Sequence, residues 1–223
     1  MSFAWQGLPS CRPVQKLMQA MQAAPPVALR IGATKTIGDY ILGPAIRRFL
    51  DAPDHQLQFL VDNTAALLHR LEQGELDFVV LEGVFNKARY DSFLLRNEPY
   101  IGICPPGHPL DGQTISPEAL LGQRLILREE GSGTRDLLER ALAQCSYTVE
   151  AFSGTVCVSS FKVIRDLVCA GYGISFVYAA VAADLPAPGR FFCPPLTGSH
   201  ELNAVWLKGT DAGALARAFV AGL

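Results

Sequence analysis

Residues 27–81 alternate between short apolar runs and segments with helical spacing, and this alternation constrains the fold more than any other feature. The apolar runs, which are typical of buried strands, are residues 27–31, 56–61 and 78–81. Between them, residues 34–50 and 64–74 carry apolar side chains at helical spacing. A strand–helix–strand–helix–strand order implies parallel strands joined by right-handed crossovers. Ligands of such sheets bind at the carboxyl ends of the strands.

Polar residues follow all three of these predicted strands. They are Thr34, Lys35 and Thr36 after the first strand, Asn63 and Thr64 after the second, and Glu82 after the third. A helix start presents unpaired N–H groups and a partial positive charge, so a helix that begins just beyond a strand suits an anion or a carboxylate. Threonines that only cap their helices would give the same pattern, and the stretch alone leaves both interpretations open.

A glycine-rich turn in the second half of the chain indicates a similar site. Residues 125–127 form a predicted strand, and Ser132, Gly133, Thr134 and Arg135 connect it to a helical pattern. Glycines there allow successive N–H groups to face one hollow, and a guanidinium suits an oxyanion. The alternative is a plain turn, with Arg135 paired to Glu139 on the helix surface. The spacing of a P-loop is absent.

The remaining segments are assigned in outline. Residues 93–104 contain two short strand candidates, and the proline-rich residues 105–110 cross into a second subdomain. Ser160 precedes another helix, either as a plain cap or as a ligand contact. Other predicted elements are a helix start at 116–118, strands at 148–152 and 174–177, a short helix at 178–185, return strands at 191–192 and 202–207, and a closing helix at 212–223.

Composition excludes several classes of function. The net charge of −2 provides no basic field to hold nucleic acid. No apolar run reaches the roughly 18 residues that a membrane span needs, and the N-terminus lacks the pattern of a signal peptide, so we expect a cytoplasmic protein. The six cysteines and four histidines are scattered, which predicts free thiols and no metal site. No catalytic set can be argued from spacing, so we expect neither an enzyme nor a cofactor.

Several motifs together resemble the effector-binding (substrate-binding) domain of LysR-type transcriptional regulators. The resemblance covers nearly all of residues 27–223, and its order and spacing are more specific than any single motif. The motifs are LRIGATKTIG at 29–38, Pro44 in the first helix, LEQGELD at 71–77, PGHPL at 106–110, EGSGTR at 130–135, and residues 164–174 with their AGYGI ending.

The resemblance implies an α/β fold like that of type II periplasmic binding proteins, with two Rossmann-like subdomains joined by two crossover strands. Subdomain I would comprise residues 27–104 plus 192–223, and subdomain II residues 105–191. The effector, here an anion or carboxylate, would bind in the cleft between them. The implied ligand-binding residues are Thr34, Lys35, Thr36, Asn63, Thr64, Ser132, Gly133, Thr134, Arg135 and Ser160. The family also implies a homodimer.

One departure from the family concerns the N-terminus. Family members carry a winged helix-turn-helix and a linker helix, whereas only 26 residues precede the first predicted strand here. We interpret residues 1–26 as a tail or linker remnant, and we expect no DNA binding by this chain alone. The alternative function is a stand-alone or transport-related solute-binding protein of the same fold.

Overall fold

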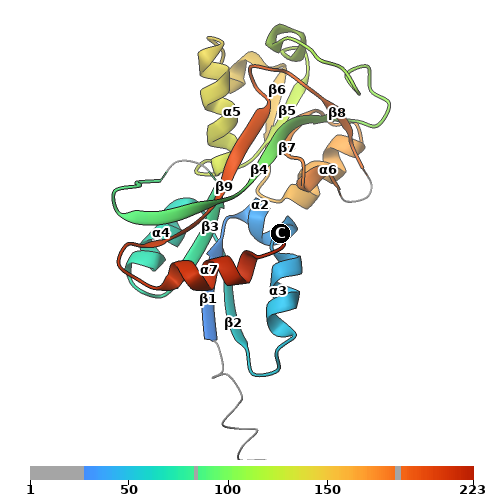
Figure 1. Ribbon diagram of the computed structural model, residues 1–223. Coiled ribbons are helices and arrows are strands. Elements are labelled where there is room, and N and C mark those ends of the chain that lie inside the picture. Colours follow the sequence, from blue (N-terminus) through green and yellow to red (C-terminus); the bar gives the residue numbers. More distant parts are fainter. Residues whose placement is uncertain (1–27, 83–84, 184–186) are drawn as a thin grey trace, which may run out of the picture.

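The computed structural model describes residues 28–82, 85–183 and 187–223, which form two lobes (Figure 1). The predicted tail at residues 1–26 lies outside this described part. The strands are β1 (Ala28–Ala33), β2 (Gln56–Val61), β3 (Phe78–Glu82), β4 (Tyr90–Cys104), β5 (Arg124–Leu127), β6 (Gly154–Cys157), β7 (Ser175–Tyr178), β8 (Gly189–Phe191) and β9 (Gly198–Leu207). The α-helices are α2 (Lys35–Tyr40), α3 (Gly43–Leu50), α4 (Thr64–Glu72), α5 (Gly133–Gln144), α6 (Phe161–Cys169) and α7 (Ala212–Val220).

The predicted parallel arrangement of the first three strands is confirmed. The larger sheet runs in the order β2-β1-β3-β9-β4-β7, with β8 also paired to β4. Strand β1 is parallel to both β2 and β3, and β9 is antiparallel to β3 and β4. Strands β5 and β6 form a parallel pair, which a bridge from Leu125 to Ile174 joins to the segment before β7.

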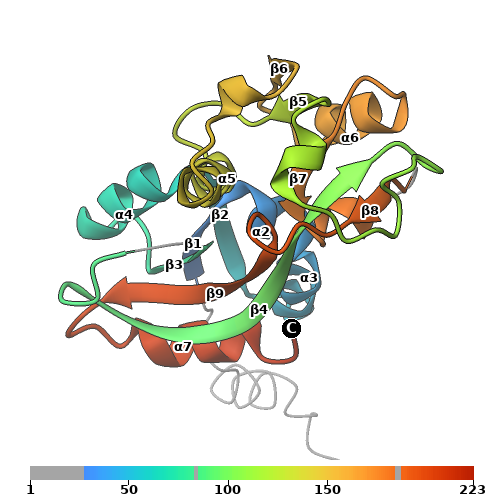
Figure 2. The same cartoon turned by 90° about the horizontal axis from the view of Figure 1, so that it is seen from above.

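Two long strands connect the lobes. Strand β4 pairs with β9 from Tyr90–Leu207 to Tyr100–Gly198, and the register shifts between Leu94 and Arg96. Figure 2 shows the two strands running side by side along the molecule. We call the part around β1, β2, β3, α2, α3, α4 and α7 lobe I, and the part around β5, β6, β7, β8, α5 and α6 lobe II.

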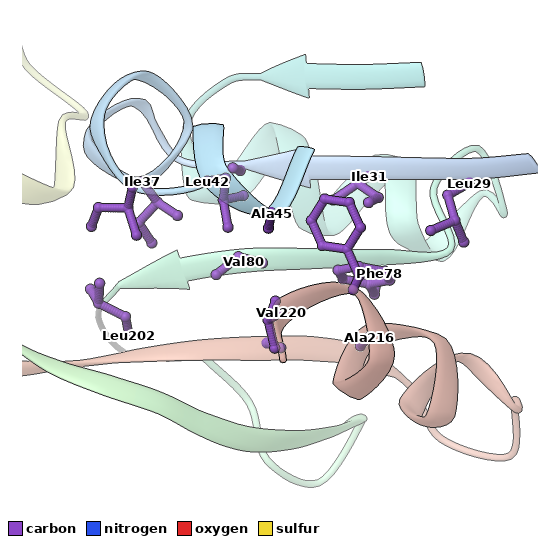
Figure 3. Close-up of a cluster of buried hydrophobic side chains, with 14 of the residues drawn as sticks. Leu29, Ile31, Ile37, Leu42, Ala45, Phe78, Val80, Leu202, Ala216 and Val220 are labelled. Atoms are coloured by element: carbon purple, nitrogen blue, oxygen red, sulfur yellow. The ribbon is translucent and has the colours of Figure 1, made fainter. Parts of the chain in front are cut away.

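The core of lobe I follows from strand alternation. In β3, Phe78 and Val80 pack in one cluster with β1, α2, α3 and α7 (Figure 3), whereas Val79 and Leu81 pack on the opposite face in the cluster beneath α4. Successive side chains of a strand point to opposite faces, so a continuous apolar run is what a strand covered on both sides requires. Every residue of β3 is buried.

Lobe II has its own apolar clusters on the two sides of β5 and β7. One of them includes Tyr100, Cys104, Cys193 and Leu196, which lie just outside the range predicted for subdomain II. The boundaries themselves, at residues 104/105 and 191/192, stay a prediction.

The predicted single helix over residues 34–50 is wrong, because α2 ends at Tyr40 and α3 begins at Gly43. Pro44 lies at the start of α3 and has no N–H to donate to the carbonyl of Tyr40, so the helical hydrogen-bond ladder stops there. The break leaves α2 short, with its first turn at the end of β1.

Three further predictions need correction. Residues 93–104, expected to contain two short strands, belong to one strand, β4, which has a register shift between Leu94 and Arg96. Residues 148–152 contain a 3₁₀ helix (Val149–Ala151), since Val149 and Phe152 are buried three positions apart, and the strand β6 follows at Gly154. Tyr178 belongs to β7, and the predicted helix at 178–185 is a 3₁₀ helix (Val181–Ala183), with its end outside the described residues.

Gly102, in the part of β4 that enters lobe II, allows the close approach of an aromatic ring. A Cβ at this position would lie 2.2 Å from Cε2 of Phe191, which is fully buried and cannot move aside. We expect Gly102→Ala to lower the free energy of unfolding by about 1–3 kcal/mol through overpacking, measured by urea denaturation. Gly122→Ala is the control, because a Cβ there meets no atom within 4 Å, and it should change stability by less than about 0.5 kcal/mol. Equal losses in both variants would contradict this prediction.

Candidate functional site

A polar cavity of about 270 Å³ lies between the lobes. From lobe I it is lined by Thr34, Lys35, Thr36, Val61, Asp62, Asn63, Thr64 and Glu82, and from lobe II by Arg128, Glu129, Ser132, Gly133, Thr134 and Ser159. These residues end or follow β1, β2, β3, β5 and β6, so the cavity lies at the carboxyl ends of parallel strands. That is where α/β sheets bind their ligands.

The structure brings together the predicted site residues except Arg135 and Ser160, which are absent from the cavity lining. Arg135 donates from Nε to Oε1 of Glu139 at 2.6 Å and lies 3.7 Å from Oε1 of Glu130. It thus makes the surface pair that sequence reasoning weighed as the alternative. Ser160 caps α6, with Oγ accepting from the N–H of Val163 at 3.4 Å. Its neighbour Ser159 lines the cavity instead.

Thr36 is a cavity residue with an unsatisfied hydroxyl. Its side chain is 1 % exposed, and Oγ1 has no hydrogen-bond partner within the described residues. A buried hydroxyl without a partner costs about 1–3 kcal/mol. Such exceptions are few in folded proteins and call for an explanation, and a ligand that hydrogen-bonds Thr36 would remove this cost.

The helices α4 and α5 both begin at the cavity, but only α4 has a side chain that caps its backbone N–H groups. Asn63 caps α4, since Oδ1 accepts from the N–H of Ala66 at 2.9 Å. Ser132 precedes the 12-residue helix α5, and its side chain makes no capping hydrogen bond in the described structure. The start of α5 therefore combines an unused cap hydroxyl with the partial positive charge of a helix N-terminus.

Glu82 is a buried acid in the wall of this cavity. It is 5 % exposed, and Oε2 accepts a short hydrogen bond from the Thr34 hydroxyl. Burial raises the pKa of Glu82, although the hydrogen bond from Thr34 and the positive charge of Arg128 act in the opposite direction. Thr34 is the residue before α2 and is fixed by this contact, not by capping its helix.

Arg128 is a buried base that sequence reasoning missed. Its Nε and Nη2 donate to the two carboxylate oxygens of Glu129, each at 2.7 Å, and its guanidinium lies 4.2 Å from the centre of the Phe161 ring. The same pair contributes to lowering the pKa of Glu129, against the opposing effect of burial. Arg128 directly follows β5, so the position after a predicted strand was the signal that could have found it, as it was for Asp62.

The described residues contain no group of three or more histidine, cysteine or acidic side chains that could hold a metal ion. The cysteines among them are all free thiols, and Cys11 lies outside the described part. In the same residues, no helix is both long enough and apolar enough to cross a bilayer.

Two α/β lobes, two crossover strands and a polar cavity between the lobes define a ligand-binding domain of the type II periplasmic-binding-protein class. A family model described as the LysR substrate binding domain matches residues 24–223. The chain therefore belongs to the LysR substrate-binding domains, which are the effector-sensing domains of LysR-type regulators.

Individual relatives agree with this assignment. The HTH-type transcriptional regulator CbbR of Sinorhizobium medicae is 31 % identical over 153 residues, which cover 68 % of this chain and 48 % of that protein. The CcmR regulatory domain of Synechocystis PCC6803, solved in complex with 2-PG, superposes with a TM-score of 0.77 at 19 % identity, covering 87 % of this chain and 96 % of that one. The effector-binding domain of QuiR, solved with shikimate, gives a TM-score of 0.70 at 17 % identity and covers 87 % and 95 %. The chain spans about half the length of the curated relatives it matches.

The burial of Glu82 predicts a pH-dependent gain in stability on its neutralisation. The pKa of Glu82 is higher in the folded than in the unfolded protein. The contribution of Glu82 to stability is therefore fully present below its unfolded pKa, and it is lost as the pH rises through its folded pKa. Glu82→Gln should therefore be more stable than the wild type at pH 7, and the difference should shrink toward pH 4. Urea denaturation across this range measures it.

The control is Glu75→Gln, which removes an exposed acid paired with the exposed Arg70 and should change stability little at any pH. A constant difference between Glu82→Gln and the wild type from pH 4 to pH 7 would contradict the prediction.

Proposed function

We propose that this chain senses a small anionic effector in the cavity between its lobes, as the regulatory part of a LysR-type transcriptional regulator. The observation that carries the proposal is the unsatisfied hydroxyl of Thr36 in a cavity that the start of α5 also lines. A ligand with anionic oxygens would accept hydrogen bonds from these groups and interact favourably with the helix N-terminus. The cavity volume suits a small metabolite.

The effector would act by joining the lobes. Thr34, Thr36 and Asn63 belong to lobe I, whereas Ser132 and Thr134 belong to lobe II, and all of them line one cavity. A ligand that contacts both walls stabilises the arrangement in which they face each other, and it shifts the balance by its differential affinity for that arrangement. In the complete regulator, this change would be passed to a DNA-binding helix-turn-helix. We infer that the chain alone binds no DNA and acts in the cytoplasm without catalysis.

Ligand binding should raise the melting temperature. A ligand at about 100 times its dissociation constant stabilises the folded state by about 2.7 kcal/mol, which corresponds to roughly 5–10 °C for a chain of this size. A thermal-shift screen with sulfate, phosphate, nitrate and small carboxylates, plain and hydroxylated, measures this. If no anion raises the melting temperature, the proposal fails.

Thr36→Val tests where the ligand binds. The change keeps the shape and removes the hydroxyl, so the free protein should become slightly more stable, while affinity for the ligand found in the screen should fall roughly three- to tenfold. Arg135→Ala is the matched control, since Arg135 is paired with Glu139 outside the cavity lining, and it should leave affinity within about twofold. Titration calorimetry of the three proteins distinguishes this site from one centred on Arg135.

We also infer a homodimer, because two-fold dimers are the commonest homo-oligomers of soluble proteins. Large apolar side chains are exposed on elements of both lobes, including Leu50 of α3 and Val163 of α6. Sedimentation velocity should show twice the mass of one chain at micromolar concentration. A monomer at all concentrations would contradict this inference.

A further inference from the structure

The cavity wall carries more negative than positive groups, which is unusual for a site that receives an anion. Its acids are Asp62, Glu82 and Glu129, and its bases are Lys35 and Arg128. Both bases already have acidic neighbours: Arg128 is bound to Glu129, and Lys35 lies 3.5 Å from Asp39. A bare oxyanion would meet little uncompensated positive side-chain charge here.

Glu82 lies close to the start of α5. Its Oε2 accepts from Thr34 of lobe I, and its Oε1 lies beside lobe II: a Cβ built on Gly133 would be 3.7 Å from this oxygen. Gly133 is the first residue of α5 and lines the cavity. A carboxylate oxygen and the α5 N-terminus therefore border the same small space.

The physical consequence concerns the ligand. A ligand made only of acceptor oxygens would bring negative charge within a few ångströms of a buried carboxylate, where repulsion is poorly screened. A ligand that also carries a hydroxyl or ammonium group would donate to the carboxylate, and hydrogen bonds to ionised acceptors are the strong ones. The same buried acceptor would be left unpaired by an analogue that lacks the donor.

We propose that the effector carries a hydrogen-bond donor, a hydroxyl or an ammonium group, in addition to its anionic group, and that Glu82 is the specificity-determining acceptor of this donor. The inference rests on the proposed function and refines it. It assigns the anionic group to the Thr36 hydroxyl and the α5 start, and the donor to Glu82. Plain inorganic oxyanions are then poor ligands of this site.

The test is titration calorimetry on the whole chain with matched probes at pH 7.5. Glycerate carries hydroxyl donors, serine carries an ammonium and a hydroxyl, propionate is the carboxylate without donors, and sulfate is a bare oxyanion. Wild-type protein should bind glycerate or serine at least about tenfold more tightly than propionate or sulfate. The stronger of these two probes indicates whether the donor is a hydroxyl or an ammonium group.

Two carboxylate variants separate a specific contact from a general charge effect. Glu82→Gln should reduce the ratio of donor-bearing to plain affinities to within about threefold. Asp62→Asn removes the same charge from the same cavity, but at a side chain that accepts from the N–H of Asn63, and it should leave the ratio unchanged.

A third variant, Gly133→Ala, adds a methyl group at ordinary contact distance from Glu82, so the protein should fold while all probes bind more weakly.

The outcomes distinguish this inference from the proposed function. If propionate or sulfate binds the wild type as tightly as glycerate and serine, and Gly133→Ala weakens that binding, the cavity is an anion site and the inference about the donor is wrong. If Asp62→Asn changes the ratio as much as Glu82→Gln, the specific role of Glu82 is wrong. If no probe binds the wild type, the anion-sensing proposal itself is contradicted along with this one.

Discussion

The antiparallel pairing of β4 with β9 is the constraint on which the rest of the structure depends. These strands are far apart in the sequence, yet they are hydrogen-bonded from Tyr90–Leu207 to Tyr100–Gly198. Because both strands run through both lobes, they fix which strand ends face each other across the cavity. Without this pairing, the polar turn after β1 and the glycine-rich turn before α5 would be two ordinary helix starts on separate parts of the molecule.

Local sequence rules predicted most of lobe I and the positions of its site residues. The turn at Thr34–Thr36 follows from a buried strand that feeds a helix, and Asn63 follows from the same rule one strand later. Those rules work because a strand covered on both faces needs a continuous apolar run, and because each helix start needs polar partners. The helix break before Pro44 was also readable in principle, since proline has no N–H.

The same local rules could not predict which side chains meet when the folded chain brings distant segments together. The spacing of Arg135 and Glu139 permits an ion pair, but only the folded position of α5 decides between that pair and a ligand. The position of Arg128 after a predicted strand could be read locally, but its contact with the ring of Phe161, 33 positions later in the sequence, could not. The prediction of a strand at 148–152 was wrong for a related reason, because Val149 and Phe152 are both buried and their spacing suits one helical turn.

The paired strands between the lobes also restrict how the protein can move. A two-stranded ribbon held by its own hydrogen bonds resists stretching and shear, but it can twist about its long axis. Strands β4 and β9 pair with each other alone only from Asn97–Glu201 to Pro99–Ser199, because β3 reaches Leu202 on β9 and β7 begins opposite Tyr100 on β4. We therefore expect relative motion of the lobes to be torsion of this short ribbon. Ligand binding in the cavity would then rotate one lobe against the other, and this rotation has a direction as well as a magnitude.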